Sequence, residues 1–312
     1  MKQILSIRLF LSASLLMAVS AIAGPLQRAD VINAPLWVIH VDADALRQTV
    51  VGQFLLAEMQ KPDAQKKFAA FQAIFNFDPR KELHGLTLYG ASKAEEDGVL
   101  LVYADFDAAR LTTLAEGAKD HQSSTHGQYV IHNWIDEKKQ PKNGVQPRTY
   151  AAISGKVVIF AQKETRVAEA LDVLDRTKPN LDTNPQFTTL GTGTGFIQAA
   201  AGKMEMPAND PNAALLKQSK MVMLDLGESQ RRVEGTLTLA TDGEEAAGQL
   251  EAVGRGLIGL MSLQSDKPEN VKLAQALAVE RAGANVMVRL AMPADDVVGM
   301  MKADAARKAA KQ

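Results

Sequence analysis

The stretch WVIHVDAD, residues 37–44, contains the pattern from which the fold of this chain is predicted. Its first five residues are mostly apolar and rich in β-branched side chains, which favours a short strand. Asp42 and Asp44 follow, and their carboxylates can accept hydrogen bonds from the free N–H groups of a first helical turn. A helix is therefore expected over about residues 45–60, where apolar residues recur at helical spacing.

The same order of apolar strand, acidic or turn residue and amphipathic helix recurs along the chain. The expected pairs are 100–103 with 108–119, 157–160 with 164–176, 236–239 with a helix ending near 264, and 286–290 with the last helix. Other strands follow each other directly, as hairpins do. These hairpins join 86–89 to 99–103, 149–153 to 157–160, and 220–226 to 233–239.

Hairpins mixed with strand–helix units predict an α+β fold. We expect two related halves of mixed, largely antiparallel sheet, with helices packed mainly on one face. A polar, proline-containing stretch near residues 177–185 marks the boundary between the halves. The expected segments are a signal peptide over 1–23, an N-terminal linker over 24–34, halves over 35–178 and 179–302, and a basic helical tail over 303–312.

Residues 1–23 have the order of a secretory signal peptide, with positive charge first, then an apolar run, then small residues. The apolar run is about half the ~20 residues that a spanning helix needs, so no membrane span is expected after cleavage. The residues concerned are Lys2 and Arg8, the run 9–19, and Ala21 and Ala23 before the expected cleavage at Gly24. The sequence therefore predicts export to the periplasm or the extracellular space.

Composition narrows the classes of function. The chain has no cysteine, which excludes thiol catalysis, cysteine-ligated zinc and a lipid anchor on a cysteine. Its formal net charge of −1 leaves no basic excess, so nucleic acid is not an expected partner. The expected partner is an unknown protein or a second copy of the chain.

Three histidines, His121, His126 and His132, lie close together in sequence and raise the question of a metal site. His126 and His132 have the even spacing that would place them on one face of a strand. Six residues of strand separate them by about 20 Å, which is too far for one zinc ion. We therefore predict no metal site and no catalytic residues.

Other candidate motifs also favour structural roles. The glycine-rich run 191–195 lacks the strand before it and the helix after it that a phosphate-binding loop needs. Alternating methionines at 204/206 and 221/223 have a spacing that could ligate copper(I), but the ordinary interpretation is favoured, with Met221 and Met223 as flexible core side chains on one strand face. No cofactor is expected. Carboxylate pairs occur at 42/44, 105/107 and 295/296, and helix capping explains their recurrence at strand-to-helix joins.

The expected helix that ends near 264 contains four glycines, at 248, 254, 256 and 259. Each lowers the stability of the helix by up to about 1 kcal/mol relative to alanine. Close helix packing or a self-association face could account for them.

Two stretches carry a resemblance to known proteins: FNFDPRKELHGLTLYG, residues 75–90, and the closing strand and helix over 286–301. With the repeated layout, they make the chain similar to a family of uncharacterised secreted bacterial proteins with two related α+β repeats. The family has no established activity, cofactor or catalytic residues, so the resemblance implies none here.

The sequence favours an exported, non-catalytic protein that binds a partner protein or assembles with itself. An alternative is a carrier of a small apolar ligand, held between helices and sheet, with Phe68, Phe71, Phe75 and Trp37 as candidate lining residues. An exported hydrolase is the least favoured alternative, because histidine is scarce and the carboxylates are expected to cap helices.

Overall fold

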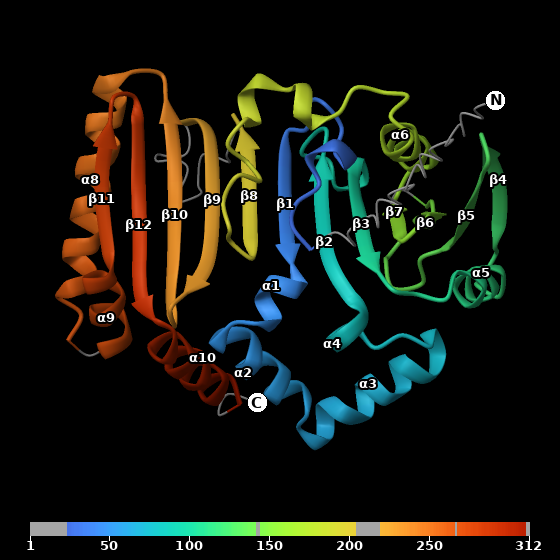
Figure 1. The fold of residues 1–312 in the computed structure, drawn as a ribbon, viewed down its shortest axis with the longest axis horizontal. Coiled ribbons are helices and arrows are strands. Elements are labelled where there is room, and N and C mark those ends of the chain that lie inside the picture. Colours follow the sequence, from blue (N-terminus) through green and yellow to red (C-terminus); the bar gives the residue numbers. More distant parts are fainter. Residues whose placement is uncertain (1–23, 142–143, 204–218, 266, 310–312) are drawn as a thin grey trace, which may run out of the picture.

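The computed structural model describes residues 24–141, 144–203, 219–265 and 267–309. Their strands form one twelve-stranded sheet in the order β11-β12-β10-β9-β8-β1-β2-β3-β7-β6-β5-β4 (Figure 1). The strands are β1 (Trp37–Asp42), β2 (Leu83–Gly90), β3 (Gly98–Ala104), β4 (Gln122–His126), β5 (Tyr129–Ile135), β6 (Arg148–Ser154), β7 (Val157–Ala161), β8 (Ile197–Gly202), β9 (Ser219–Ser229), β10 (Arg232–Thr241), β11 (Leu277–Ala282) and β12 (Asn285–Pro293).

Neighbouring strands in this sheet are antiparallel throughout the described residues, and the predicted α+β class is confirmed. Pairing of β1 with β8 joins residues 37–161 to residues 197–293 in one continuous sheet. The residues expected as an N-terminal linker pack onto this sheet, and Val31 within them is fully buried.

The helices lie around the sheet and along one of its ends (Figure 1). They are α1 (Ala43–Arg47), α2 (Val50–Met59), α3 (Pro62–Phe75), α4 (Pro79–Glu82), α5 (Ala108–Glu116), α6 (Glu164–Leu174), α8 (Glu244–Ser262), α9 (Pro268–Ala276) and α10 (Ala294–Ala309). Short 3-10 turns occur at η1 (Arg28–Asp30), η2 (Glu95–Asp97), η3 (Leu181–Thr183) and η4 (Pro185–Phe187).

The helix expected over 45–60 is divided into α1 and α2. Thr49 interrupts it, and its hydroxyl caps α2 by accepting a hydrogen bond from the Gly52 N–H at 2.8 Å. Gly52 lies so close to α1 that a Cβ on it would be 1.8 Å from the Leu46 carbonyl oxygen. The tight turn between the two helices therefore depends on a glycine, which helical periodicity alone does not reveal.

Strand pairing divides the side chains between two faces of the sheet. We call face A the side that carries Ile39, Leu88 and Phe160, which the register places in one row across β1, β2, β3 and β7. Face B is the opposite side and carries Val38 and Tyr89. Side chains alternate between the faces because the period of a strand is two residues.

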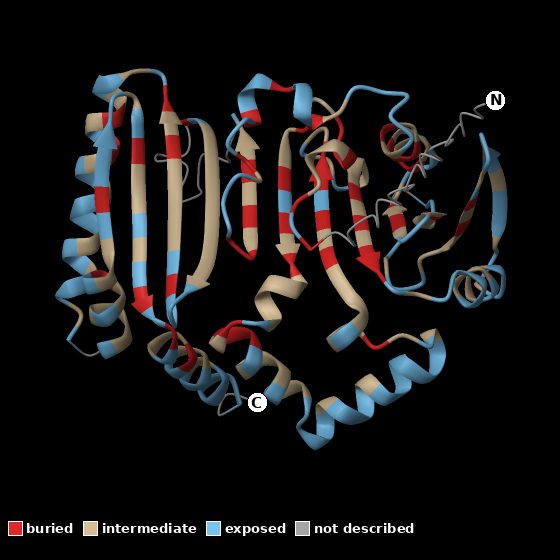
Figure 2. Ribbon diagram, in the orientation of Figure 1, coloured by how far each residue is buried: buried red, intermediate tan, exposed pale blue. Residues whose placement is uncertain are grey.

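Face B carries the main core. Helix α6 covers it and buries Val167, Ala170, Leu171 and Val173. The turns at η1, η3 and η4 extend this cover, and Figure 2 shows buried residues concentrated on the central strands.

Face A is covered in separate places. Helix α8 packs over β10, β11 and β12, helices α2 and α10 pack at one end of the sheet, and α5 lies over β5. Between these helices the sheet face stays open, and the apolar side chains of Ile39 and Leu88 are 43% and 37% exposed. Most helices that contact the sheet therefore lie on one face, but they do not close it.

His40 connects β1 to its surroundings on face B. The side chain is 1% exposed, with Nε2 2.9 Å from the Gly24 carbonyl oxygen and Nδ1 2.9 Å from the Thr87 hydroxyl. A carbonyl oxygen can only accept, so Nε2–H donates to Gly24 and neutral Nδ1 accepts from Thr87. Burial lowers the pKa of His40, while the Gly24 carbonyl and Asp42 act in the opposite direction.

This geometry predicts a loss of stability in mild acid. His40 stays neutral in the folded chain, whereas an unfolded histidine takes up a proton below about pH 6.5. The unfolding free energy should therefore fall as pH drops below that value. His40→Gln should flatten this decline in urea unfolding curves measured between pH 7.5 and 5, and an unchanged slope would contradict the assignment.

Candidate functional site

The strongest candidate site lies under α5, a helix that covers face A loosely. Asp107 caps this helix by accepting from the Arg110 N–H at 3.0 Å. None of its residues is buried, whereas α6 buries four on the other side of the same strands. When the apolar side chains of a helix point toward a sheet but stay part-exposed, the helix and the sheet are not closely packed, and space remains between them.

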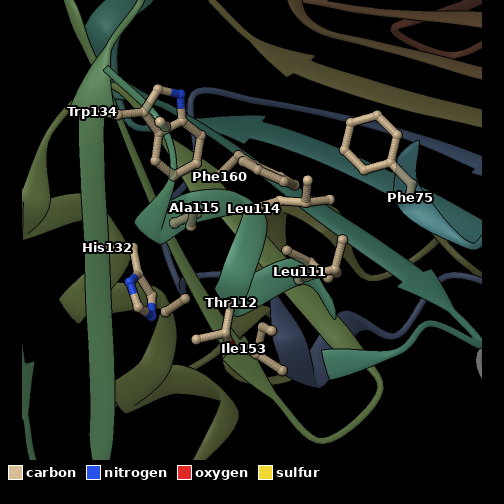
Figure 3. A pocket seen from close by; sticks show the side chains of 13 residues that line it. Phe75, Leu111, Thr112, Leu114, Ala115, His132, Trp134, Ile153 and Phe160 are labelled. Atoms are coloured by element: carbon tan, nitrogen blue, oxygen red, sulfur yellow. The ribbon is translucent and has the colours of Figure 1, made fainter. Parts of the chain in front are cut away.

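That space is a cavity of about 300 Å³ between α5 and face A (Figure 3). Its roof is α5, its floor is β5, β6 and β7, and Phe75 from the end of α3 closes one side. The lining residues are Phe75, Leu111, Thr112, Leu114, Ala115, Ala118, His132, Trp134, Ala151, Ala152, Ile153, Val158 and Phe160.

Strand alternation explains which side chains reach the cavity. Ala151 on β6 is opposite His132 on β5 and Phe160 on β7, so the three share face A. Their neighbours Ile131 and Ile159 point to face B, where both belong to the main core. Each strand therefore contributes to the core on one side and to the cavity on the other.

Both ends of α5 are anchored. At its start, Arg110 Nε donates to the carbonyl oxygen of Ile74 on α3 at 2.8 Å. Just beyond its end, the Ile135 N–H on β5 donates to the Lys119 carbonyl oxygen at 3.0 Å. These contacts set where the helix lies and oppose its collapse onto the sheet.

His132 is the ionisable side chain in the cavity lining. Its Nδ1 lies 3.0 Å from Nε2 of His121, and the two rings stack with centroids 5.3 Å apart. Burial lowers the pKa of His132, and the neighbouring His121 lowers it further, while the Glu116 carboxylate acts in the opposite direction. His132 therefore favours its neutral form near pH 7.

The expectation that His126 and His132 share a strand face is wrong. A turn at Gly127, with φ +57°, separates β4 from β5, so the two histidines lie on different strands. His126 points to the α6 side, where its Nε2 lies 2.7 Å from Asp172 Oδ1. The same hairpin brings His121 to His132. Among the described residues no three potential ligands lie close enough to hold a metal ion.

The acidic pairs do not act uniformly as helix caps, contrary to expectation. Asp42 and Asp107 do cap, accepting from Ala45 and Arg110 N–H groups. Their neighbours instead flank His84, with Asp44 Oδ2 3.0 Å from its Nδ1 and Asp105 Oδ2 3.1 Å from its Nε2. Asp295 and Asp296 form ion pairs with Arg231 and Lys272.

The glycine-rich run 191–195 packs against β9. A Cβ on Gly193 would lie 1.8 Å from Asp225 Oδ2, and one on Gly195 would lie 2.7 Å from the Leu226 carbonyl oxygen. The glycines thus permit close approach of two backbone segments. Met204 and Met206 lie outside the described residues, as do Ala21 and Ala23 of the expected cleavage site.

Of the aromatic residues expected to line a ligand pocket, Phe75 lines the cavity. Phe68 and Phe71 border separate surface hollows near α3. Trp37 packs against Gly90 and donates its indole N–H to the Ser92 carbonyl oxygen at 3.0 Å. The sequence did not predict any residue of α5 as part of a ligand pocket. The apolar side chains that recur at helical spacing between 111 and 118 were the available signal.

Comparisons with known proteins show the fold alone. No family model matches the chain, and no curated protein matches its sequence. The chain is similar to TP0453 in crystal form III, with a TM-score of 0.51, 9% identity, and cover of 89% of this chain and 98% of that one. Crystal form I of TP0453 gives a TM-score of 0.50 at 8% identity with the same cover. These structural similarities are consistent with an α+β fold.

Among the described helices, none combines the length and the apolar character required to cross a bilayer.

Proposed function

We propose that this protein binds a small apolar ligand in the cavity between α5 and face A. The observation that carries the proposal is the cavity of about 300 Å³ with an almost wholly apolar lining. Ligand sites of this kind are concave, mostly apolar and largely preformed, with volumes from about 300 Å³ upward.

Physical reasoning favours an apolar occupant over water. Water in a cavity needs two to four polar partners, and away from Thr112, His132 and Trp134 the lining side chains provide none. An alkyl chain entering the cavity would lose its own contact with water and remove that of the lining. Each 100 Å² of apolar surface buried in this way contributes about 2.5 kcal/mol.

Filling the cavity should abolish binding. Ala115 lies on the inner side of α5 and lines the cavity, whereas Ala109 is exposed on the same helix. Ala115→Phe should weaken binding of 1-dodecanol at least about tenfold, measured by titration calorimetry, because the ring occupies the ligand's space. Ala109→Phe is the matched control and should bind as the unmodified chain does. Equal binding by both variants would contradict the proposal.

We further propose that the protein acts after export and that its mature chain begins at Gly24. Gly24 is buried, and a Cβ placed on it would lie 3.0 Å from Asp42 Oδ1 and 3.3 Å from Asp44 Oδ2. Cleavage after Ala23 would create an α-ammonium group beside these two carboxylates. Opposite charges at this range stabilise each other, which supports Gly24 as the new N-terminus.

The intact mass of protein recovered from a periplasmic fraction tests this processing. The mass should correspond to a chain that starts at Gly24. Ala23→Gln should leave the precursor uncleaved, because a signal peptidase reads a small residue at that position. A mature chain that begins elsewhere would contradict the assignment.

A second candidate function, self-association, is favoured by the outer side of α8. Val253, Leu257 and Leu260 are 47%, 47% and 61% exposed there. The glycine cluster of this helix is not explained by close packing, because a Cβ on Gly256 or Gly259 would meet no atom within 4 Å. An exposed apolar stripe of this kind is typical of an interaction surface.

If α8 forms a contact between copies, the chain should be dimeric by light scattering at micromolar concentration. Leu257→Lys combined with Leu260→Lys should then give a monomer, since the contact would bury charges without partners. Ser262→Lys, at an exposed position on the opposite side of α8 from Val253 and Leu257, should leave the dimer intact. A wild-type monomer at every concentration would exclude this second function and leave the cavity proposal unaffected.

A further inference from the structure

The cavity under α5 has a polar side chain placed where a ligand's head group could reach it. His132 lines the cavity, and Thr112 lines it from α5 (Figure 3). Among the described residues, neither Nε2 of His132 nor the Thr112 hydroxyl has a protein hydrogen-bond partner. Trp134 contributes an indole N–H, and the other lining side chains are apolar.

His121 controls what His132 offers to a ligand. Only one proton can lie between His121 Nε2 and His132 Nδ1, which are 3.0 Å apart. If His121 donates, neutral His132 carries its proton on Nε2 and can donate to the ligand. If the pair takes up a further proton, His132 becomes a charged donor while the hydrogen bond to His121 is kept. Both states offer a donor on Nε2.

We propose, resting on the ligand-binding function proposed above, that the cavity takes an amphiphile with a carboxylate head and an alkyl chain. The head accepts a hydrogen bond from His132 Nε2–H, with the Thr112 hydroxyl as a second donor, and the chain lies along the apolar lining. The His121–His132 pair takes up one proton from solution on binding, and its positive charge balances the charge of the head.

The charge balance explains why a carboxylate fits. A carboxylate that enters an apolar cavity must be paired with a positive charge or be neutralised. A proton taken up from solution by the His121–His132 pair gives an imidazolium next to the carboxylate, and hydrogen bonds between such charged groups are the strong ones. An ammonium head could donate only to the neutral tautomer in which His132 itself donates to His121, so its affinity would fall as pH falls, opposite to the dependence expected for a carboxylate.

The groups around His132 set the direction of the pH dependence. The segment before β4 contributes His121, α5 contributes Glu116, and β6 and β4 place Ala151 and Ser123 opposite His132. His132 in the free protein is neutral near pH 7, because burial and His121 lower its pKa more than Glu116 raises it. Binding a carboxylate near that pH therefore takes up one proton, and affinity for the acid rises as pH falls.

The test compares dodecanoic acid with 1-dodecanol, which share a chain and differ in the head group. Titration calorimetry between pH 8 and 6 should show that the affinity for the acid rises by up to about tenfold per pH unit, as uptake of one proton requires. The affinity for the alcohol should stay nearly constant. At pH 6 the acid should bind at least about tenfold more tightly than the alcohol.

Variants separate the head-group contact from the cavity. His132→Phe should lower the affinity for the acid to that for 1-dodecanol at pH 6, because the donor and the titrating group are both removed. His132→Gln keeps a donor without a titrating group and should remove the pH dependence. His126→Phe, on the opposite face, is the matched control and should retain both preference and pH dependence.

Each outcome has a distinct meaning. Equal affinity of the unmodified protein for acid and alcohol, or an acid preference that survives in His132→Phe, would overturn the head-group assignment and leave the cavity function standing. Failure of both ligands to bind would overturn the proposed function and this inference with it.

Discussion

The sheet has two apolar faces, and the helices cover only one of them closely. Face B receives α6 and the turns around residues 181–187, which bury side chains such as Leu171 and Phe187 completely or nearly so. Face A receives α5 and α8 at separate places and leaves Ile39 and Leu88 part-exposed. Because strand residues alternate between faces, the core on face B fixes which side chains are left for face A.

The cavity follows from this difference in how closely helices cover the two faces. Ile131 and Ile159 anchor β5 and β7 into the face B core, which turns His132 and Phe160 toward α5. Helix α5 is held at one end through Arg110 and at the other through Lys119. The helix thus lies above the sheet without filling the space, and a ligand can supply the apolar contacts that the protein lacks.

Sequence patterns predicted the fold class and most strand–helix units, since alternation and helical periodicity are local properties. They did not predict β11 and α9, or the break between α1 and α2, which depends on the contact of Gly52 with Leu46. The site was harder still. The pairing of His121 with His132 requires the β4–β5 hairpin, and the absence of buried residues in α5 depends on how the helix is anchored. Neither property is local in sequence.

The most direct measurement is methyl-resolved NMR of the protein with 1-dodecanol. Intermolecular NOEs should connect the alkyl chain to the methyl groups of Leu111, Leu114 and Ile153, which line the cavity. Val167 and Leu171 of α6, buried on the opposite face, should show none. NOEs confined to the exposed side of α8, or none to any methyl group while the ligand is bound, would contradict the assignment of the site to α5 and face A.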